Sequence, residues 1–457
     1  MNKYNRYYLL GIGGIGMSAL ARYFRIKGYE VAGYDRTQTK LTTDLSSEGI
    51  TITYQQDVNA IPATYLNPKT TLVIVTPAIP DSHPQLQYFR ENNYNIQKRA
   101  QVLGEITRTS KGICVAGTHG KTTTSTITAH LLYQSQVTCS AFLGGIANNY
   151  NTNLLLSKDS NFVVIEADEY DRSFHQLSPY MAVITSADAD HLDIYDTAEA
   201  FRESFEHFTS LIRPGGALIM RKGIDIKPKL QKGVKLFTYS MNDGGDFRAE
   251  NIRVTKGEIH FDFVTPTDRI ADVRLGVPVM INVENSVAAM ALAWLNGVTA
   301  EELRVGISSF SGIYRRFNIV YKSEKVIYMD DYAHHPSELK ASISSIKALY
   351  PERKITGIFQ PHLYSRTRDF ATDFAAALSQ LDELILLDIY PARELPIEGV
   401  SSEIIFRNVT IEHKTLCSKE NLLELLKEKT PEVLVTFGAG DIDQLVPQIK
   451  NQLISKI

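Results

Sequence analysis

The sequence predicts an α/β protein with three domains, and two kinds of pattern support this prediction. Apolar strand patterns and helix patterns alternate over residues 1–107 and again over residues 314–457, which favours parallel sheets covered by helices. Two glycine-rich turns, Gly11–Gly16 and Gly117–Gly120, each join an apolar strand to a helix pattern. We therefore expect a phosphate-binding turn in each of the first two domains.

The middle segment, residues 108–313, has a different pattern. After the second glycine turn come two apolar strands, "NFVVIEADE" and "YMAVITSADADH". A stretch from Gly233 to Ile281 is rich in short strands with glycine and aspartate turns, and two helix patterns close the segment. We expect a central domain with a mixed or parallel sheet and a small β-rich part.

The bulk composition excludes several classes of protein. With 457 residues, 44% of them hydrophobic, the chain is long enough for separate domain cores. A formal net charge of −3 gives no basic surface for nucleic acid, and the three cysteines have no metal-ligand spacing. No apolar run reaches the ~20 residues of a membrane span, and the N-terminus has no signal-peptide pattern. We expect a cytoplasmic enzyme, a monomer or homodimer, without membrane insertion or a nucleic-acid partner.

The second glycine turn, "VAGTHGKTTT", predicts an ATP site. Gly117 and Gly120 let backbone amides turn toward a phosphate at a helix start. Lys121 then reaches the β- and γ-phosphates, and Thr122 offers its hydroxyl to Mg²⁺. Val115 stands where the standard phosphate loop has its first glycine. The alternative is a chance Gly-Lys-Thr at a helix start.

Acidic residues directly after two apolar strands predict the Mg²⁺ ligands. The first stretch, "EADEYDRSF", supplies Glu166, Asp168, Glu169 and Asp171, and the second, "ADADHLD", supplies Asp188, Asp190, His191 and Asp193. Carboxyl ends of parallel strands share one edge of a sheet, and Mg²⁺ prefers oxygen ligands. The alternative is a pair of solvated acidic loops.

The first glycine turn fits the dinucleotide fingerprint, because Asp35 follows Gly11, Gly13 and Gly16 at the usual spacing. This keeps an NAD-dependent oxidoreductase as one alternative. However, hydride transfer consumes no ATP, and the same turn can hold any diphosphate. A regulatory ATP-binding module without catalysis is a further alternative.

The motifs "GIGGIGMSALA", "AGTHGKTTT", "EADEYDRSF", "DADHLDIY", "SGIYRRF", "DDYAHHPSEL" and "FQPHLYSRT" resemble those of the Mur ligases, over nearly the whole chain. The resemblance implies a Rossmann-like N-terminal domain for a UDP-sugar, a central P-loop ATPase domain, and a Rossmann-like C-terminal domain that closes over both. It implies ATP-dependent addition of L-alanine to the carboxylate of UDP-N-acetylmuramate through an acyl phosphate, in peptidoglycan precursor synthesis. Within the family, the alternative is the muropeptide-recycling branch, which adds a tripeptide.

The two turns and the resemblance together give the expected site residues. Those expected to bind ATP are Gly117, Thr118, His119, Gly120, Lys121, Thr122, Thr123, Asn282, Asn285 and Arg316. Those expected to bind Mg²⁺ are Thr122, Glu166 and His191. Those expected to face the UDP-sugar or the amino acid are Gly11, Gly13, Gly14, Gly16, Asp35, Thr76, Tyr332, His334, His362 and Arg366.

Catalysis is assigned to Lys121, with His335 or Asp331 orienting the amine or accepting its proton. The structural alternatives are that the His334–His335 pair caps a helix and that Arg315–Arg316 is a solvated linker. The sequence departs from the family pattern at Ile281, Ser186 and Tyr170, where histidine, asparagine and serine are usual.

Overall fold

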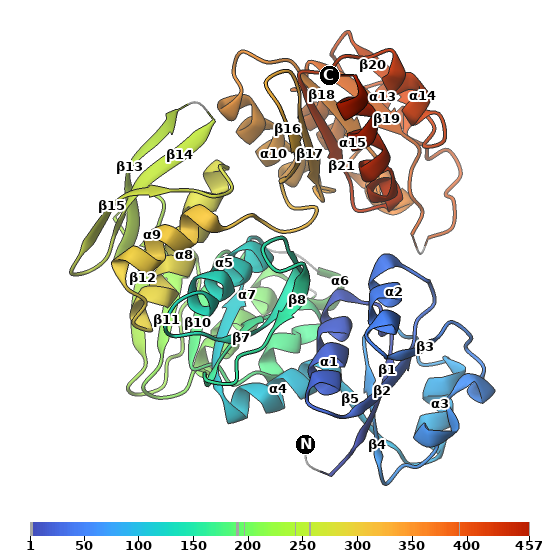
Figure 1. Ribbon diagram of the computed structural model, residues 1–457, viewed down its shortest axis with the longest axis vertical. Coiled ribbons are helices and arrows are strands. Elements are labelled where there is room, and N and C mark those ends of the chain that lie inside the picture. Colours follow the sequence, from blue (N-terminus) through green and yellow to red (C-terminus); the bar gives the residue numbers. More distant parts are fainter. Residues whose placement is uncertain are drawn as a thin grey trace. The chain divides into compact units, whose positions relative to one another are not determined.

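The computed structural model describes residues 3–188, 192–195, 197–242, 244–255, 257–392 and 394–456. It contains three sheets, of five, ten and six strands, so the predicted three-domain α/β class is confirmed (Figure 1). By contacts the chain divides into two compact units, and each is described by itself. The first comprises residues up to 252, 260–276 and 281–310, and the second comprises 253–259, 277–280 and 311 onward.

The first sheet has the order β3-β2-β1-β4-β5, and all its strands are parallel. Its strands are β1 (Arg6–Leu10), β2 (Glu30–Tyr34), β3 (Thr51–Thr53), β4 (Thr71–Val75) and β5 (Asn95–Lys98). Its helices are α1 (Ile15–Ile26), α2 (Lys40–Ser47), α3 (Pro84–Glu91) and α4 (Arg99–Thr109). The chain order reverses beside β1, which is where open α/β sheets bind ligands.

Side chains of β1 alternate between two apolar layers, as a strand buried on both faces requires. Tyr7 stacks on Phe24 of α1 with ring centroids 3.7 Å apart. Tyr8 points to the other face and packs against Phe89 of α3. Helices α1 and α3 accordingly lie on opposite sides of this sheet (Figure 1).

The second sheet has the order β15-β14-β13-β12-β11-β10-β6-β9-β7-β8. Its strands are β6 (Lys111–Ala116), β7 (Ser140–Ala147), β8 (Thr152–Leu155), β9 (Phe162–Glu166), β10 (Met181–Ile184), β11 (Ala217–Arg221), β12 (Lys235–Ser240), β13 (Phe247–Thr255), β14 (Glu258–Val264) and β15 (Arg269–Arg274). The helices of this segment are α5 (Lys121–Tyr133), α6 (Leu192–Tyr195), α7 (Ala198–Ser210), α8 (Met280–Leu295) and α9 (Ala300–Ser309). The predicted β-rich stretch is thus the outer end of the same sheet.

The third sheet has the order β16-β17-β21-β18-β19-β20, with β16 antiparallel to β17. Its strands are β16 (Asn318–Lys322), β17 (Ile327–Asp331), β18 (Ile355–Phe359), β19 (Glu383–Leu387), β20 (Lys414–Cys417) and β21 (Val433–Phe437). Its helices are α10 (Pro336–Leu349), α11 (Tyr364–Asp369), α12 (Ala371–Leu378), α13 (Glu403–Phe406), α14 (Leu422–Lys427) and α15 (Val446–Ser455).

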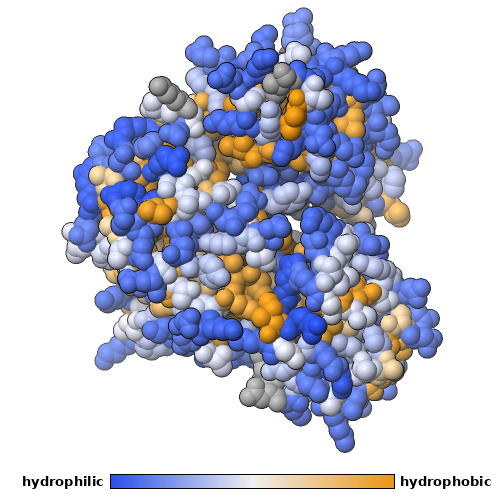
Figure 2. Space-filling model, viewed as in Figure 1, coloured by the Kyte–Doolittle hydropathy of each residue, from blue (hydrophilic) through white to orange (hydrophobic). Residues whose placement is uncertain are grey.

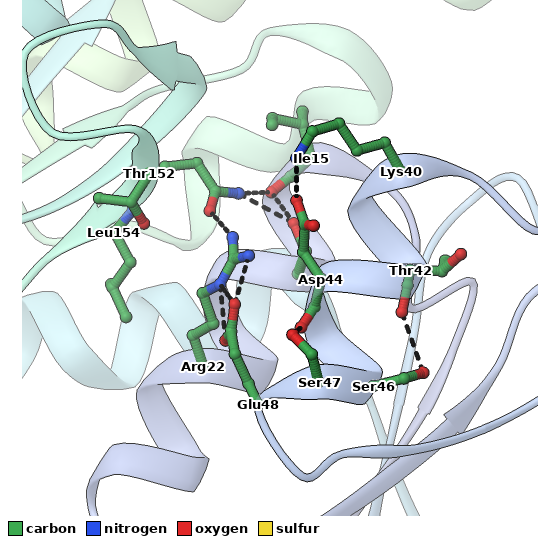
Figure 3. A network of polar contacts seen from close by, with 12 residues as sticks. Ile15, Arg22, Lys40, Thr42, Asp44, Ser46, Ser47, Glu48, Thr152 and Leu154 are labelled. Carbon is green, nitrogen blue, oxygen red and sulfur yellow. Dashed lines mark hydrogen bonds and ion pairs between the residues drawn. The ribbon is translucent and has the colours of Figure 1, made fainter.

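A polar network ties the hairpin β7–β8 to α1. The guanidinium of Arg22 donates to both carboxylate oxygens of Glu48, at 2.7–2.9 Å (Figure 3). It also donates to Asn153 Oδ1 at 2.6 Å, and Asn153 Nδ2 donates to the backbone oxygen of Ile15 at 2.6 Å. Asn153 is fully buried, and its side-chain oxygen and nitrogen both have hydrogen-bond partners inside the protein.

The surface is mainly polar on the face that Figure 2 shows, with hydrophobic residues in separate patches. Among the residues that the structure describes, no helix combines the length and the hydropathy required to cross a bilayer.

Candidate active site

The first glycine loop joins β1 to α1 where the sheet order reverses. Gly11 has φ +82°, a conformation that L residues rarely adopt, and an added Cβ would lie 2.4 Å from Thr76 Cγ2. The amides of Gly11 and Ile12 both donate to the backbone oxygen of Tyr34, at 2.8 and 3.0 Å. Gly14 then caps α1 in an extended conformation. The loop therefore places Thr76 against Gly11, with the start of α1 directly after it.

Asp35, at the end of β2, binds the loop backbone itself. Its Oδ2 accepts a 2.7 Å hydrogen bond from the amide of Gly13. An added Cβ on Gly13 would lie 2.8 Å from the same oxygen. A diphosphate that uses this amide must therefore compete with the Asp35 carboxylate. The spacing of the motif alone does not reveal this competition.

Arg99, the first residue of α4, lies against the first glycine loop. An added Cβ on Gly16 would lie 2.3 Å from Arg99 Nη1. The other terminal nitrogen, Nη2, donates to Asp168 Oδ2 at 3.0 Å. Because β1 and β5 are parallel strands of one sheet, Arg99 stands at the same edge as the loop. It links that edge to the acidic segment that follows β9.

The second glycine loop leads from β6 into α5. Gly117 and Gly120 have φ +139° and +79°, so both positions favour glycine. Gly120 is the residue before the helix, and Lys121, Thr122 and Thr123 form its first turn. Backbone amides at this helix start can hold an anion, as the sequence predicts.

The segment after β10 supports the backbone of this loop. Thr118 Oγ1 donates to the backbone oxygen of Asp188 at 2.7 Å, and the amide of His119 donates to Ser186 Oγ at 2.8 Å. The hydroxyl of Thr185 donates to the backbone oxygen of His119 at 2.5 Å. Ser186, which departs from the family pattern, thus still holds the loop through its side chain.

Lys121 forms a buried ion pair with Glu169. Its Nζ lies 2.7 Å from Glu169 Oε1 and also donates to the backbone oxygens of Gly117 and Thr118, at 2.8 and 3.3 Å. Burial alone would lower the pKa of Lys121, but the negative charges of Glu169, Glu166 and Asp168 together raise it. Lys121 is therefore held as a cation at the start of α5.

Glu166, the last residue of β9, lies beside Gly144 of β7. An added Cβ on Gly144 would lie 1.9 Å from Glu166 Oε2, so the carboxylate occupies space that only glycine leaves. In the described ranges, three or more His, Cys, Asp or Glu residues nowhere group as a ready metal cage. Mg²⁺ usually takes one or two protein ligands and keeps waters or phosphate oxygens as the others. The hydroxyl of Thr122 and the carboxylate of Glu166 fit that requirement, and His191 lies outside the described residues.

Asn282 and Asn285 of α8 are buried next to the phosphate loop. Thr124 Oγ1 donates to Asn285 Oδ1 at 3.3 Å, and an added Cβ on Gly120 would lie 2.8 Å from that oxygen. Asn285 Nδ2 donates to Asn282 Oδ1 at 3.2 Å. Both asparagines therefore stand beside the loop that is expected to hold ATP, whereas Ile281 is exposed.

In the second unit, two arginines stack on Tyr332. The guanidinium carbons of Arg316 and Arg315 lie 4.9 and 5.2 Å from its ring centroid. Arg315 also donates to the backbone oxygen of Gly438 at 2.5 Å and lies 3.4 Å from Asp443 Oδ2. The alternative of a solvated arginine pair is wrong for Arg315, whose side chain is 12% exposed.

The carboxylates of Asp330 and Asp331, at the end of β17, are both buried. Burial raises the pKa of Asp330 to about 6, although Thr436 donates to its Oδ1 at 2.7 Å. Asp331 accepts 2.6 Å from Ser342 Oγ and 3.3 Å from the amide of Phe317. These contacts hold the Asp331 carboxylate in place, and burial raises its pKa.

His334 and His335 precede α10 and differ in environment. His335 is the N-cap: its Nδ1 accepts from the amide of Ser337, and Glu338 Oε2 accepts from the amide of His335 at 3.2 Å. The helix-cap alternative is therefore correct for His335. His334 Nδ1 lies 2.9 Å from the backbone oxygen of Tyr332, and burial lowers the pKa of His334. His334 is thus held as a neutral imidazole.

His334 follows β17, and His362 and Arg366 follow β18, at the same edge of the third sheet because both strands run parallel to β21. The His362 ring is 6.0 Å from that of His334 and stacks on Tyr390 at 5.8 Å. The positive charge of Arg366 contributes to the lowered pKa of His334. The second unit therefore gathers Tyr332, His334 and His362 with their cationic neighbours.

Comparison with known families decides the class of the protein. Residues 6–111 match the Mur ligase family catalytic domain, residues 115–293 the Mur ligase middle domain, and residues 315–440 the Mur ligase glutamate ligase domain. The chain belongs to the Mur ligase family. The predicted family is therefore confirmed.

Curated relatives of this Mur ligase align over its full length. A UDP-N-acetylmuramate–L-alanine ligase from Parabacteroides distasonis is 61% identical over 100% of this chain and 99% of its own. A protein of the same name from Phocaeicola vulgatus is 59% identical over 100% of both chains.

Among solved structures, a UDP-N-acetylmuramate-alanine ligase from Thermotoga maritima matches with a TM-score of 0.84 at 26% identity, over 99% of this chain and 100% of that one. A murein peptide ligase from Psychrobacter arcticus shares the fold, with a TM-score of 0.68 at 21% identity over 98% of both chains.

Three residues of this Mur ligase that were not predicted contact the expected site residues, namely Arg99, Arg315 and Glu338. Glu169 was expected only as one of the possible Mg²⁺ ligands, and in the structure it pairs with Lys121. Glu169 and Arg315 stand inside the quoted motifs "EADEYDRSF" and "SGIYRRF", so their sequence signal was present. Arg99 directly follows the carboxyl end of a strand of the first sheet. That position is where open α/β sheets bind ligands, so it was the sequence signal for Arg99 as a site residue.

Proposed function

We propose that this chain catalyses the ATP-dependent joining of L-alanine to the carboxylate of UDP-N-acetylmuramate, giving ADP and phosphate, in peptidoglycan precursor synthesis. The observation that carries the proposal is the full-length identity of 61% with a ligase of that name, through all three matched domains. The position of Lys121 at the start of α5 supports the use of ATP.

The reaction requires activation of a carboxylate, because a free carboxylate is a poor electrophile. Transfer of the γ-phosphoryl group gives an acyl phosphate, the amine of L-alanine attacks its carbonyl carbon, and phosphate leaves. Phosphoryl transfer depends mainly on positioning and charge neutralisation. We assign both roles, at the β- and γ-phosphates, to Lys121 and the amides of the second loop.

Mg²⁺ is part of this proposal, with Thr122, Glu166 and His191 as its protein ligands. When bound, it supplies Lewis-acid neutralisation of phosphate charge. The chain's own contribution is to place Glu166 beside Gly144, at the end of β9, and Thr122 in the first turn of α5.

The first loop is assigned to the diphosphate of the UDP-sugar, with Gly11, Gly13, Gly14, Gly16, Asp35 and Thr76 around it. In the second unit, Arg316 is assigned to the nucleotide, and Tyr332, His334, His362 and Arg366 to the substrates. His335 and Asp331 are the candidate groups for orienting the amine or accepting its proton, and His334, whose pKa is lowered by burial, is a further candidate. A cytoplasmic location, where ATP and nucleotide sugars are found, completes the proposal.

The alternatives have less support. The murein peptide ligase from Psychrobacter arcticus is 21% identical, against 61% for the alanine ligase from Parabacteroides distasonis. All three matched domains are Mur ligase domains, which gives no support to an NAD-dependent oxidoreductase.

The test is phosphate release with UDP-N-acetylmuramate and ATP plus L-alanine, L-serine, glycine or the tripeptide L-Ala-D-Glu-diaminopimelate. We expect the highest kcat/KM with L-alanine. Preference for the tripeptide would favour the recycling branch, and no release with any mixture would favour a non-catalytic module. NADH consumption in the same preparation tests the oxidoreductase.

A further inference from the structure

The ammonium of Lys121 already makes three hydrogen bonds within the protein. Its acceptors are Glu169 Oε1, at 2.7 Å, and the backbone oxygens of Gly117 and Thr118. An ammonium group has three donors, so all of them are engaged. A phosphate that binds to Lys121 must therefore replace at least one of these acceptors.

Of the three acceptors of Lys121, Glu169 is the one with a negative charge. Its side chain is 2% exposed, and its second oxygen, Oε2, is buried with no hydrogen-bond partner among the described residues. Tyr195 donates to the backbone oxygen of Glu169 at 2.5 Å, and Arg99 holds the adjacent Asp168. The segment is thus fixed at two points, so the carboxylate stays beside Lys121.

A bound triphosphate would bring a second anion to the same cation. Two anions in a buried site repel each other, and the ammonium group of one lysine cannot form its best hydrogen bonds with both. Burial already raises the pKa of Glu169 to about 7, while Lys121 opposes this rise. Loss of the lysine contact therefore leaves Glu169 in surroundings that disfavour its charge.

We propose that Glu169 is a positioning residue that competes with the nucleotide phosphates for Lys121. This rests on the proposed function, since it assigns Lys121 to ATP. Before nucleotide binds, Glu169 keeps Lys121 charged and in contact with the backbone of the second loop. When nucleotide binds, Lys121 exchanges Glu169 for phosphate, and when ADP leaves, Glu169 takes Lys121 back. The exchange weakens nucleotide binding and speeds product release.

The variant Glu169→Gln tests the competition, because glutamine keeps the shape of the side chain and removes its charge. Asp171→Asn is the matched control, since Asp171 lies in the same segment but pairs with Lys98 at 2.7 Å. The Kd values of Mg-ATP and Mg-ADP are measured by calorimetry, and kcat by phosphate release.

We expect Glu169→Gln to bind both nucleotides about tenfold more tightly than the parent. This value corresponds to a parent in which Lys121 is released from Glu169, and so is available to phosphate, in about a tenth of the unliganded molecules. The kcat should fall, because ADP leaves more slowly. Asp171→Asn should stay within about twofold of the parent in both quantities. Unchanged or weaker nucleotide binding by Glu169→Gln overturns the proposal.

A measurement on the parent protein covers the case in which Glu169→Gln does not fold. Crystal structures with and without Mg-ADP should show Lys121 Nζ within hydrogen-bond distance of Glu169 only in the nucleotide-free form. A pair retained in both forms overturns the proposal. Phosphate release by the parent with UDP-N-acetylmuramate and L-alanine separates the proposed function from the exchange at Lys121. Absence of phosphate release contradicts the proposed function. The exchange at Lys121 is then still tested by the nucleotide-binding measurements.

Discussion

Asn153 and Arg22 form a hydrogen bond of 2.6 Å that joins strand β8 to helix α1. Arg22 is also paired with Glu48, and Asn153 donates to the backbone oxygen of Ile15 in the first turn of α1. The hairpin that follows the phosphate-loop helix in the chain therefore fixes the helix that follows the first glycine loop.

Asn153→Ala should lower the free energy of unfolding by about 2–4 kcal/mol, because it leaves Arg22 Nη1 and its surroundings without a buried partner. Urea denaturation measures the change. The control is Asn161→Ala, at an exposed position close to the start of β9, for which we expect a change within about 0.5 kcal/mol. Equal midpoints for the two variants would mean that the network contributes nothing to stability.

Lys121→Ala should reduce ligation by about 10³–10⁵-fold, since a cation that faces the transferring phosphate is lost. It should also lower the free energy of unfolding by about 3–5 kcal/mol, because Glu169 remains buried without its counter-ion. The double variant Lys121→Ala/Glu169→Gln should recover stability and stay inactive. Near-normal turnover in either folded variant would contradict the phosphate-loop assignment.

Gly13→Val should weaken the binding of UDP-N-acetylmuramate and leave ATP binding unchanged. The added side chain meets Thr42 Cγ2 at 2.6 Å and Asp35 Oδ2 at 2.8 Å, so the loop must shift. Calorimetry of the full-length parent and variant with each ligand measures the effect, and NAD is the negative control. Loss of ATP binding with intact UDP-sugar binding would show that the two loops were assigned the wrong way round.

His191→Ala should raise the Mg²⁺ concentration needed for half-maximal activity more than it raises the KM for ATP. His191 lies outside the described residues, so its assignment as a ligand is a prediction from the sequence. Activity is titrated against Mg²⁺ in the parent and the variant. Superimposable curves would favour the solvated acidic loop.

Asp330→Asn should remove a pH dependence of stability in the second unit. The pKa of Asp330 is raised from 3.8 to about 6, so the folded state keeps a proton that the unfolded state has lost between these values. The stabilisation is complete below about pH 4 and is lost as the pH rises through 6, a change of about 3 kcal/mol. Unfolding by urea from pH 4 to 7 measures the difference between parent and variant. The control Asp373→Asn, at an exposed position, should leave the parental dependence unchanged.

The sequence predicted those features that depend on local pattern. Strand and helix alternation gave the α/β class, and the glycine turns fell where β1 and β6 end, because positive φ at Gly11 and Gly117 requires glycine. The role of His335 was harder to assign, since the motif that suggests catalysis also fits a helix cap, and the structure shows the cap.

Contacts between distant segments could not be predicted from the sequence. Asp35 binds the amide of Gly13, and Glu169 binds Lys121, 48 positions away. Each of these acids was visible as a polar residue after a strand. Which partner each one takes depends on the register of neighbouring strands and on burial, and neither is encoded in the spacing of a motif.

The attachment of α1 to the hairpin β7–β8 has a consequence for anyone who wishes to dissect this protein. A fragment that ends at residue 107 would lose Asn153 and Phe142, whose ring lies 5.3 Å from that of Tyr23 on α1. Its exposed helix face would keep the Arg22–Glu48 pair but lose the contacts to Asn153 and Phe142, which leaves aromatic rings on a surface prone to aggregation. Screening of small molecules against the first glycine loop should therefore use the intact chain, with the second loop occupied by nucleotide.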